Sequence, residues 1–287
     1  MSESAEHFVA RSYPSEAWGT YRGDALTRLL IRTCRAIPRA PIVKQLVFPI
    51  RKFARSRLNG PIDHHLWGHR LRFRPNGNIA EGRLLFLPER WDPSERAALT
   101  QRLRPGDTFV DVGANFGGYT WWALSRLGRR IRVIAFEPDP ELYQGLRFNL
   151  QSNGFEDVSV LPITVGTEVG TFELHVSLEN RGQNSLIRPE EGSYQSRTVA
   201  VRPLAALLDE QEVRRVDAMK IDIEGMEPAV LDRFLGEAPR TVWPRLLICE
   251  RKETAEHQAL VDRLEAEGYR VVRTTRLNLV AELREGR

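Results

Sequence analysis

The stretch that decides the fold is residues 109–120, Phe109-Val-Asp-Val-Gly-Ala-Asn-Phe-Gly-Gly-Tyr-Thr120. Its mostly apolar start predicts a buried strand, and the apolar run that begins at Tyr119 predicts a helix. Between them, Gly113 and Gly117 form a turn. Glycines at such a turn let the backbone approach a ligand closely, and the helix N-terminus offers free N–H donors. We therefore expect a strand, a turn and a helix, with a ligand bound at the turn.

A second predicted strand, residues 131–136, ends at Glu137. This carboxylate follows the glycine turn by about 20 residues and lies at the tip of the second strand, which is the arrangement that binds the two hydroxyls of a ribose. The sequence therefore predicts a cofactor that contains a nucleoside, with Glu137 on its ribose.

The glycine spacing favours one cofactor over another. A dinucleotide site has the pattern G-x-G-x-x-G, whereas three residues separate Gly113 from Gly117 here. In addition, Asp111 stands inside the strand just before the turn, and a carboxylate there suits a positively charged ligand better than a pyrophosphate. Together with the following Phe136-Glu-Pro-Asp-Pro140, the motif resembles the S-adenosylmethionine site of a class I methyltransferase, so we expect this cofactor, which carries a sulfonium charge, rather than NAD. A glycine-rich turn in an ordinary α/β domain would explain Gly113 alone, but not the whole set.

Composition sets the broad class of the protein. The chain has 287 residues, of which 41% are hydrophobic and 28% charged, as in a soluble globular protein with one α/β domain and an extension. Its two cysteines, Cys34 and Cys249, belong to no metal-binding pattern, so we expect a reduced, cytoplasmic setting. No apolar segment reaches the roughly 18–20 residues needed to cross a bilayer, and the polar N-terminus is unlike a secretory signal.

Positive charge is concentrated near the N-terminus. Residues 22–57 hold ten Lys and Arg residues against one acid, Asp24: Arg22, Arg28, Arg32, Arg35, Arg39, Lys44, Arg51, Lys52, Arg55 and Arg57. Apolar residues, Ile42 and Val43 among them, interleave with these cations. The stretch is either an amphipathic surface that contacts an anionic membrane or a polyanionic glycan, or a helical cap whose apolar face packs on the domain. No recognised nucleic-acid module occurs, so we expect no nucleic-acid partner.

The rest of the chain divides into a lead-in, 61–105, and a main domain, 106–287, after a basic, partly helical extension, 1–60. In the lead-in we expect short strands at 71–73 and 83–87 and a helix at 93–103, with Asp92 as its N-cap. The main domain alternates strands and helices, which predicts an α/β, Rossmann-like fold with a seven-stranded, mostly parallel sheet. Strands are expected at 108–112, 131–136, 158–163, 216–221, 245–249, 269–273 and 277–282. Helices are expected at 118–127, 139–152, 203–210, 227–235 and 254–267. An insertion, 171–201, is expected to carry strands at 171–176 and 197–202.

A second motif, Lys220-Ile-Asp-Ile-Glu-Gly-Met-Glu227, follows the fourth sheet strand. Open α/β sheets bind ligands at the carboxyl ends of their strands, where the glycine turn also lies. Asp222 and Glu224 alternate along extended backbone, so both can point to the same side. The alternative is that these acids cap the next helix, which suits Glu227 but explains the other two less well.

With both motifs, the chain resembles the FkbM family of S-adenosylmethionine-dependent class I methyltransferases. The resemblance covers about residues 84–282. It rests on residues 106–117, on Phe136-Glu137-Pro138, on residues 220–225, on the polar insertion Asn184-Ser185-Leu186 and on a fifth strand that ends in Glu250. The family often has a histidine soon after that glutamate, whereas this chain has Arg251 and Lys252.

The resemblance implies a role for each matching residue. The methionine end of the cofactor would lie on Asp111, Gly113, Asn115 and Gly117, its ribose on Glu137 and its adenine beside Ile163 and Thr164. The catalytic candidates would be Asp222, Glu224 and Glu250, as general base and as groups that position the acceptor, with Asp222 also at the cofactor. We assign no metal, although the same three carboxylates are the residues that could hold Mg²⁺.

The family implies methylation of a hydroxyl. We expect a saccharide, glycan or glycolipid acceptor, such as a uronic acid or a lipopolysaccharide sugar, which the basic extension would suit. One alternative is an O-methyltransferase of a small secondary metabolite such as a polyketide. Another is a non-catalytic, cofactor-binding scaffold.

Overall fold

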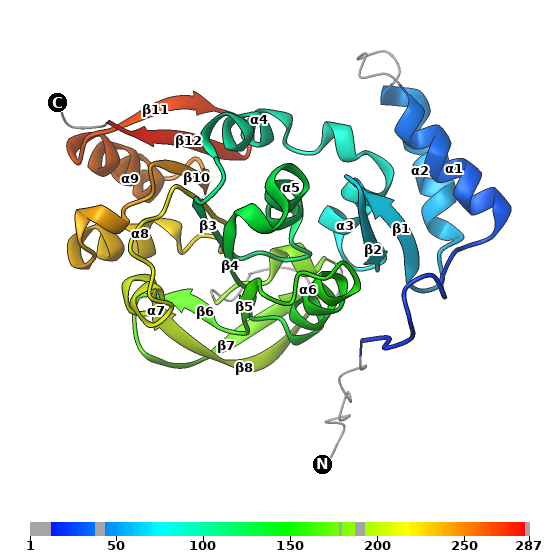
Figure 1. Ribbon diagram of the computed structural model, residues 1–287, viewed down its shortest axis with the longest axis horizontal. Coiled ribbons are helices and arrows are strands. Elements are labelled where there is room, and N and C mark those ends of the chain that lie inside the picture. Colours follow the sequence, from blue (N-terminus) through cyan, green and yellow to red (C-terminus); the bar gives the residue numbers. More distant parts are fainter. Residues whose placement is uncertain (1–12, 38–43, 178–179, 187–192, 285–287) are drawn as a thin grey trace.

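The computed structural model describes residues 13–37, 44–177, 180–186 and 193–284 (Figure 1). Its centre is a seven-stranded sheet in the order β11-β12-β10-β9-β3-β4-β5, in which β12 runs antiparallel to its neighbours and the other strands are parallel to one another. The strands are β3 (Thr108–Val112), β4 (Arg132–Phe136), β5 (Ser159–Leu161), β9 (Ala218–Ile221), β10 (Leu246–Glu250), β11 (Tyr269–Thr274) and β12 (Asn278–Leu283). The predicted seven-stranded, mostly parallel sheet is confirmed.

Both faces of the sheet are covered, because alternate side chains of each strand point to opposite sides. Phe109 and Val133 pack in one core with α4 (Pro93–Arg102), α5 (Gly118–Leu127) and α6 (Pro140–Ser152). Val110 and Ile134 pack in the other core with α7 (Leu204–Glu210), α8 (Glu227–Glu237) and α9 (Ala255–Ala266). Strands buried on both faces are typical of parallel sheets, and they leave the carboxyl ends free to form a site.

The predicted insertion forms a separate small sheet. It contains β6 (Thr164–Gly166), β7 (Gly170–Ser177) and β8 (Tyr194–Pro203), in the order β6-β8-β7. Both predicted insertion strands are present, and β8 is longer than expected. The chain passes from the main sheet to this small sheet at residues 162–163, beside the carboxyl ends of the main strands (Figure 1).

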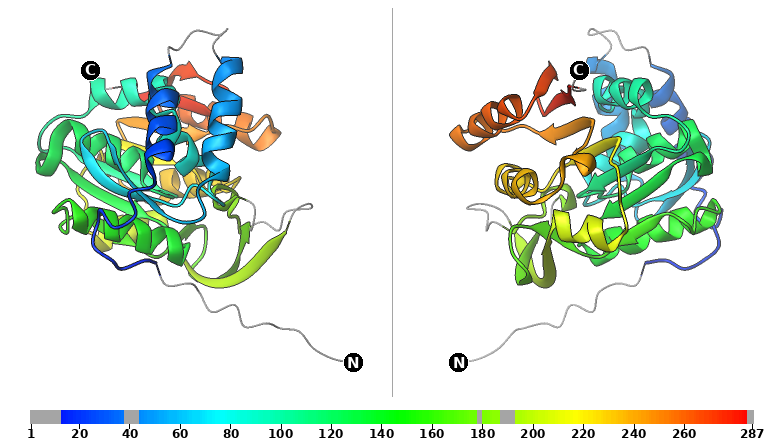
Figure 2. Two further views of the ribbon diagram at one scale, coloured as in Figure 1. Left: turned by 90° about the vertical axis from the view of Figure 1, so that its right-hand side faces the viewer. Right: turned by 60° about the vertical axis from the view of Figure 1, so that its left-hand side comes forward.

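The N-terminal part packs beside the main sheet. It consists of the helices α1 (Ala25–Ala36) and α2 (Lys44–Ser56), the hairpin β1 (Ile62–Leu66) and β2 (His69–Phe73), and α3 (Ile79–Phe86). Side by side, α1 and α2 form the outermost layer of this side of the molecule (Figure 2). Of the basic stretch, Arg39, Ile42 and Val43 lie outside the described residues. Among the described helices, none combines the length and the apolar character that a membrane span requires.

Two predictions for the lead-in are wrong. The apolar run 83–87 is not a strand but the end of α3, which begins because the Asn78 side chain accepts the backbone N–H of Glu81 as an N-cap. A short apolar run does not distinguish a buried strand from a buried helix. Asp92 does precede α4, but its side chain does not cap that helix; it accepts the Tyr119 hydroxyl at 3.0 Å.

Candidate active site

The glycine turn and the second motif meet at the centre of the sheet. Val112 of β3 lies opposite Ile221 of β9, and the Asp222 amide donates to the Val112 carbonyl. Gly113 follows with a φ of 74°, and a Cβ there would lie 1.9 Å from the Asp222 carbonyl oxygen. Only glycine fits this position, and the close approach brings the two motifs to one edge of the sheet.

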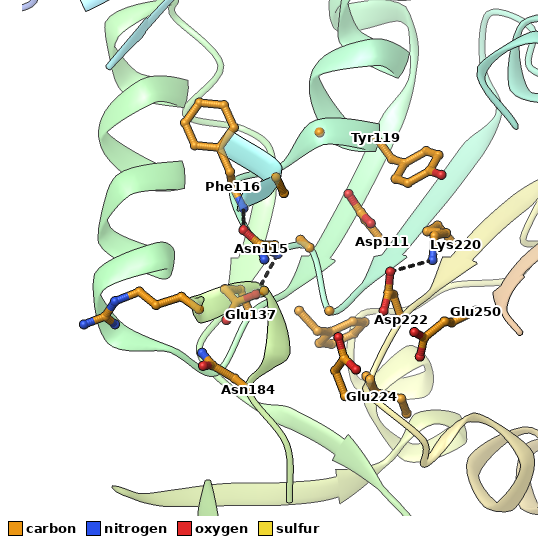
Figure 3. Close-up of a pocket in the computed structure, with 18 of the residues that line it drawn as sticks. Asp111, Asn115, Phe116, Tyr119, Glu137, Asn184, Lys220, Asp222, Glu224 and Glu250 are labelled. Carbon is orange, nitrogen blue, oxygen red and sulfur yellow. Dashed lines mark hydrogen bonds and ion pairs between the residues drawn. The ribbon is translucent and has the colours of Figure 1, made fainter. Parts of the chain in front are cut away.

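A cavity of about 460 Å³ opens at this edge (Figure 3). Nine of the ten predicted site residues line it: Asp111, Gly113, Asn115, Glu137, Ile163, Thr164, Asp222, Glu224 and Glu250. Gly117 does not line it. Gly117 precedes α5 in the left-handed conformation, and a Cβ there would lie 2.6 Å from the side chain of Leu146. Its place in the motif is therefore explained by helix packing instead of by ligand contact.

Asp111 is buried at the floor of the cavity. One of its carboxylate oxygens accepts both the backbone N–H and the hydroxyl of Thr120, at 3.0 and 2.7 Å. Burial raises the pKa of Asp111 to about 6. A buried carboxylate whose charge is only partly compensated favours a cationic ligand nearby.

Glu137 is held at the tip of β4 by two backbone amides. Its carboxylate oxygens accept the N–H groups of Asn115, at 2.6 Å, and Asp139, at 2.8 Å. Burial, followed by the charge of Asp139, raises the pKa of Glu137 to about 8. The two amides fix the orientation of the carboxylate, and its remaining lone pairs can accept hydroxyl groups of a ligand.

Thr164 presents a polar atom that the described structure does not satisfy. Its Oγ1 is buried, and among the described residues it has no hydrogen-bond partner. Because buried hydroxyls are normally paired, a water molecule or a ligand group is expected to pair this one. Ile163 lies beside it on the same wall.

Three carboxylates also gather at the cavity wall. Oxygen atoms of Asp222, Glu224 and Glu250 all lie within 4.8 Å of one another (Figure 3). The ammonium group of Lys252 is 3.4 Å from the nearest carboxylate oxygen of both Glu224 and Glu250. Burial, followed by the charge of Asp222, raises the pKa of Glu224 to about 7 and that of Glu250 to about 8. Side chains with such pKa values can exchange protons near neutral pH.

The turn that carries this cluster is held by Glu227. Its carboxylate accepts the backbone N–H groups of Ile223, at 2.7 Å, and Gly225, at 2.9 Å. These amides belong to the turn before α8 (Glu227–Glu237) and not to the helix itself, so Glu227 organises the turn and, within the described residues, makes no hydrogen bond that caps the helix, unlike the capping alternative. It also keeps Glu224 in the left-handed region, at a φ of 55°. A non-glycine residue in that region stores strain, and such strain is concentrated at functional sites.

Lys220 is a site residue that sequence reasoning missed. Its side chain is 2% exposed, and its ammonium group donates to the Asp222 carboxylate at 3.0 Å and to the Ile221 carbonyl at 3.1 Å. It also lies 5.5 Å from the centre of the Tyr119 ring. Burial lowers the pKa of Lys220, but Asp222 more than compensates and raises it above its usual value. The available signal was a lysine between apolar neighbours, Met219 and Ile221, in a strand buried on both faces.

The insertion also contributes to the cavity, which the sequence did not predict. Arg181 forms ion pairs with Asp139, at 2.6 Å, and Glu141, at 2.8 Å. Asn184 donates to Asp139 at 2.9 Å. These contacts tie the insertion to the start of α6 and place it over the cavity, where Arg181 and Asn184 form part of the wall. The rest of the rim that was not predicted includes Ile79, Arg83, Trp91, Asp92, Asn180 and Arg276.

Comparison with known proteins identifies the family. Residues 111–271 match the model of the methyltransferase FkbM domain. The chain belongs to this family. It is also 28% identical over 158 residues to the methyltransferase sdnD of Sordaria araneosa, an alignment that covers 44% of this chain and 60% of that protein. It is 38% identical over 65 residues to ribosomal RNA small subunit methyltransferase H of Chromobacterium violaceum, which covers 20% of each chain. The chain thus spans about three fifths of the first relative and a fifth of the second.

Two solved structures align with part of this chain. An rRNA methylase from Streptococcus thermophilus aligns with a TM-score of 0.41 at 12% identity, over 67% of this chain and 95% of that one. An S-adenosylmethionine-dependent O-methyltransferase from Thermotoga maritima aligns with a TM-score of 0.40 at 14% identity, over 68% of this chain and 66% of that one. The predicted FkbM resemblance and methyltransferase class are confirmed by the family match.

Family membership implies S-adenosylmethionine as the methyl donor, and the residues around the cavity fit that molecule. Gly113 lets the turn pass close to Asp222 at the edge of the cavity, and Asp111 supplies negative charge beside it. Glu137 offers a fixed carboxylate for ribose hydroxyls. Ile163 and Thr164 line the wall, where the resemblance places the adenine. Bound there, the cofactor supplies an electrophilic methyl group on a positively charged sulfur.

Proposed function

We propose that this protein methylates a hydroxyl group of a saccharide, glycan or glycolipid, with S-adenosylmethionine as the donor. The observation that carries the proposal is the carboxylate cluster Asp222, Glu224 and Glu250, which shares one cavity with the glycine turn. A sugar hydroxyl is a weak acid, so its methylation needs a group that positions the oxygen and accepts its proton.

Two carboxylates are suited to accept that proton. Glu224 and Glu250 have pKa values of about 7 and 8, so a proton taken from the acceptor at either carboxylate would be held near neutral pH. Asp222 differs because the buried ammonium group of Lys220 holds one of its oxygens at 3.0 Å. Its side chain is 40% exposed toward the cavity, so its other oxygen can bind and orient the acceptor hydroxyl.

The composition of the cavity wall supports a saccharide acceptor. Sugars combine hydroxyl groups with apolar ring faces, and proteins bind them with amides, charged groups and aromatic rings. The wall offers the amides of Asn180 and Asn184 and the rings of Trp91 and Tyr119. Arg276 adds a cation, which suits the carboxylate of a uronic acid.

The first experiment is calorimetric titration with S-adenosylmethionine and S-adenosylhomocysteine, with NAD as the control. We expect micromolar binding of the two adenosyl compounds and none of NAD. Failure of both adenosyl compounds to bind would contradict the cofactor assignment.

The acceptor is then tested by transfer of a radiolabelled methyl group to a panel of compounds. The panel contains uronic-acid oligosaccharides, lipid-linked saccharides, polyketides with free hydroxyls and ribosomal RNA. The Glu250→Gln protein is the control, because it measures methyl transfer that does not require the carboxylate cluster. We expect label on a saccharide. Label on a polyketide or on RNA alone would overturn the saccharide proposal and retain the methyltransferase.

A further inference from the structure

The surface of the α1–α2 pair carries apolar side chains that nothing in the described structure covers. Thr27, Ile31 and Cys34 of α1 face inward and are buried. On other sides of the same helix, Leu26 is 42% exposed and Leu29 is 58% exposed. A helix that packs with one apolar face has no need of a second one, so the outer leucines require another explanation.

The neighbouring helix repeats this arrangement. Ala54 of α2 is buried, whereas Phe48 is 60% exposed and Phe53 is 52% exposed. Of the nine large apolar side chains that are exposed in the described residues, four therefore lie on this pair of helices. The pair forms the outermost layer on its side of the molecule, with α1 and α2 lying next to each other (Figure 2).

The same surface is strongly basic. Arg28, Arg32 and Lys52 are exposed on it. Arg57 lies over the ring of Phe53, with its guanidinium carbon 6.0 Å from the ring centre. Asp24, just before α1, is paired with Arg57 at 2.6 Å, and the sequence from residue 25 to residue 57 contains no acid. Exposed aliphatic and aromatic side chains surrounded by cations match the interface of an anionic lipid bilayer.

We propose that the outer surface of α1 and α2 docks the protein on an anionic lipid bilayer. This surface is defined by Leu26, Arg28, Leu29, Arg32, Phe48, Lys52 and Phe53. Lipid phosphates attract the cations, and the four apolar side chains enter the boundary between headgroups and acyl chains. Protein surfaces that bind nucleic acid are also basic, but their affinity comes from phosphate contacts, to which exposed leucines contribute nothing. A second copy of the chain would bring like charges together.

The docking surface is connected to the cavity through α3. α3 packs against α1, where Arg35 donates to the Leu85 carbonyl at 2.7 Å. The start of the same helix, with the half-exposed Ile79, lines the cavity. Two helix layers, about 20 Å, thus separate the docking surface from the cavity. The docking proposal does not depend on the acceptor, because it concerns binding and not turnover.

The test is flotation of the full-length protein with vesicles. Vesicles of phosphatidylcholine with phosphatidylglycerol are compared with vesicles of phosphatidylcholine alone. We expect binding to the anionic vesicles only, and weaker binding as salt is added, because salt screens the cations. Loss of two cations in Arg28→Ala/Lys52→Ala should weaken partitioning about 25-fold, or about fivefold for each charge. Leu29→Ser/Phe53→Ser should weaken it by at least about tenfold.

Matched controls lie far from the helices. Arg214 is an exposed arginine beyond α7, and Val169 is a 75% exposed apolar residue between β6 and β7. Arg214→Ala and Val169→Ser should leave vesicle binding unchanged, and all variants should keep the same melting temperature. Equal binding to both vesicle types would overturn the proposal, as would equal losses in the control variants. Binding of ribosomal RNA or formation of a dimer that the same substitutions abolish, without vesicle binding, would assign the surface to a different partner.

Discussion

Two regions of the molecule bury charged side chains, and they treat them in opposite ways. Near the N-terminus, Arg72 and Asp63 form an ion pair at 2.7 Å in which both side chains are 0% exposed. At the end of the sheet, Asp222, Glu224 and Glu250 share the wall of a cavity with Lys220, and the ammonium group of Lys252 lies 3.4 Å from Glu224 and from Glu250. Desolvation of the charges is unfavourable in both regions, but only the region at the end of the sheet leaves its charges open to a ligand.

The N-terminal pair is saturated by its own chain. Arg72 donates to Asp63 through two nitrogens and to the carbonyls of Pro14, Glu16 and Ala17, and its guanidinium lies over the ring of Phe148. Asp63 in turn accepts two backbone N–H groups, from residues 19 and 21. The pair thus fixes the segment before α1 against β2 and α6. With every donor and acceptor occupied, it can stabilise the fold but has no capacity left for chemistry.

The cavity cluster is saturated only in part. Asp222 is 40% exposed, and burial raises the pKa values of Glu224 and Glu250 toward neutrality. The comparison teaches that burial of charge alone does not identify a site. What identifies it is charge that the protein buries and then leaves incompletely paired at a cavity.

The largest expected effect is a loss of stability when the N-terminal ion pair is broken. Arg72→Ala leaves Asp63 buried without its partner, so the free energy of unfolding should fall by about 3–5 kcal/mol. Chemical denaturation measures the change. Arg214→Ala, which removes an exposed arginine, should change the free energy by less than about 0.5 kcal/mol. Equal stability of Arg72→Ala and the unsubstituted protein would show that the N-terminal pair is not structural.

Substitution of the two cavity glutamates should lower the reaction rate and leave the stability of the fold unchanged. Glu224→Gln/Glu250→Gln removes the proton acceptors, and kcat should fall about 10²- to 10³-fold, with KM and the melting temperature nearly unchanged. Steady-state kinetics with the acceptor found in the methyl-transfer panel measure it. The matched control is Glu282→Gln, which removes a half-exposed carboxylate on β12 that pairs with Arg270. Full turnover by the double variant would remove these residues from the mechanism.

The contrast between the regions also explains what the sequence could predict. Short-range signals identified one wall of the cavity, because glycine spacing and the ends of apolar strands depend on local chain geometry. They also located the acids at 222, 224 and 250, since parallel strands must bring their carboxyl ends to one edge. Gly117 was expected at the cofactor but does not line the cavity. Its surroundings depend on the packing of Leu146 from another helix, which local signals do not show.

Contacts between distant segments were beyond such signals. Lys220 lies beside the ring of Tyr119, about a hundred positions away in the sequence, and Arg181 pairs with Asp139. The run 83–87 was predicted as a strand but forms the end of the helix at 79–86, because this apolar run has no period that excludes either form. The arginines of the basic stretch gave the charge of the α1–α2 surface, but which apolar residues face outward depends on the packing of α1 against α3.

A third prediction tests a carboxylate that is held by the backbone and still open to a ligand. Glu137→Ala removes the acceptor for the ribose hydroxyls, so affinity for S-adenosylmethionine should fall about 30- to 100-fold, or about 2–3 kcal/mol. Calorimetry measures it. S-adenosylhomocysteine carries the same ribose and should lose the same factor. Unchanged affinity for both compounds would place the ribose elsewhere.

The pH dependence of the reaction follows from the open cluster. A general base acts only when ionised, so kcat should rise with pH as Glu224 and Glu250 lose their protons, at about 7 and about 8, and then level off. The ammonium of Lys252 lowers both pKa values, whereas Asp222 and Glu227 raise them. Lys252→Met should therefore move the rising limb to higher pH. A profile that is flat, or identical in the variant, would contradict the role of these carboxylates.

The smallest expected effect concerns metal. Carboxylate triads that hold Mg²⁺ leave their negative charge for the ion to balance, whereas here Lys220 and Lys252 already lie 3.0 and 3.4 Å from the three carboxylates. Treatment with EDTA should thus change kcat by less than about twofold. Lys252→Met sharpens this test, because loss of the ammonium frees two carboxylates and should make that variant more responsive to added Mg²⁺ than the unsubstituted protein. Loss of activity in EDTA that Mg²⁺ restores would instead assign the open cluster to a metal. The incompletely paired carboxylates would then serve to bind an ion and not to accept a proton.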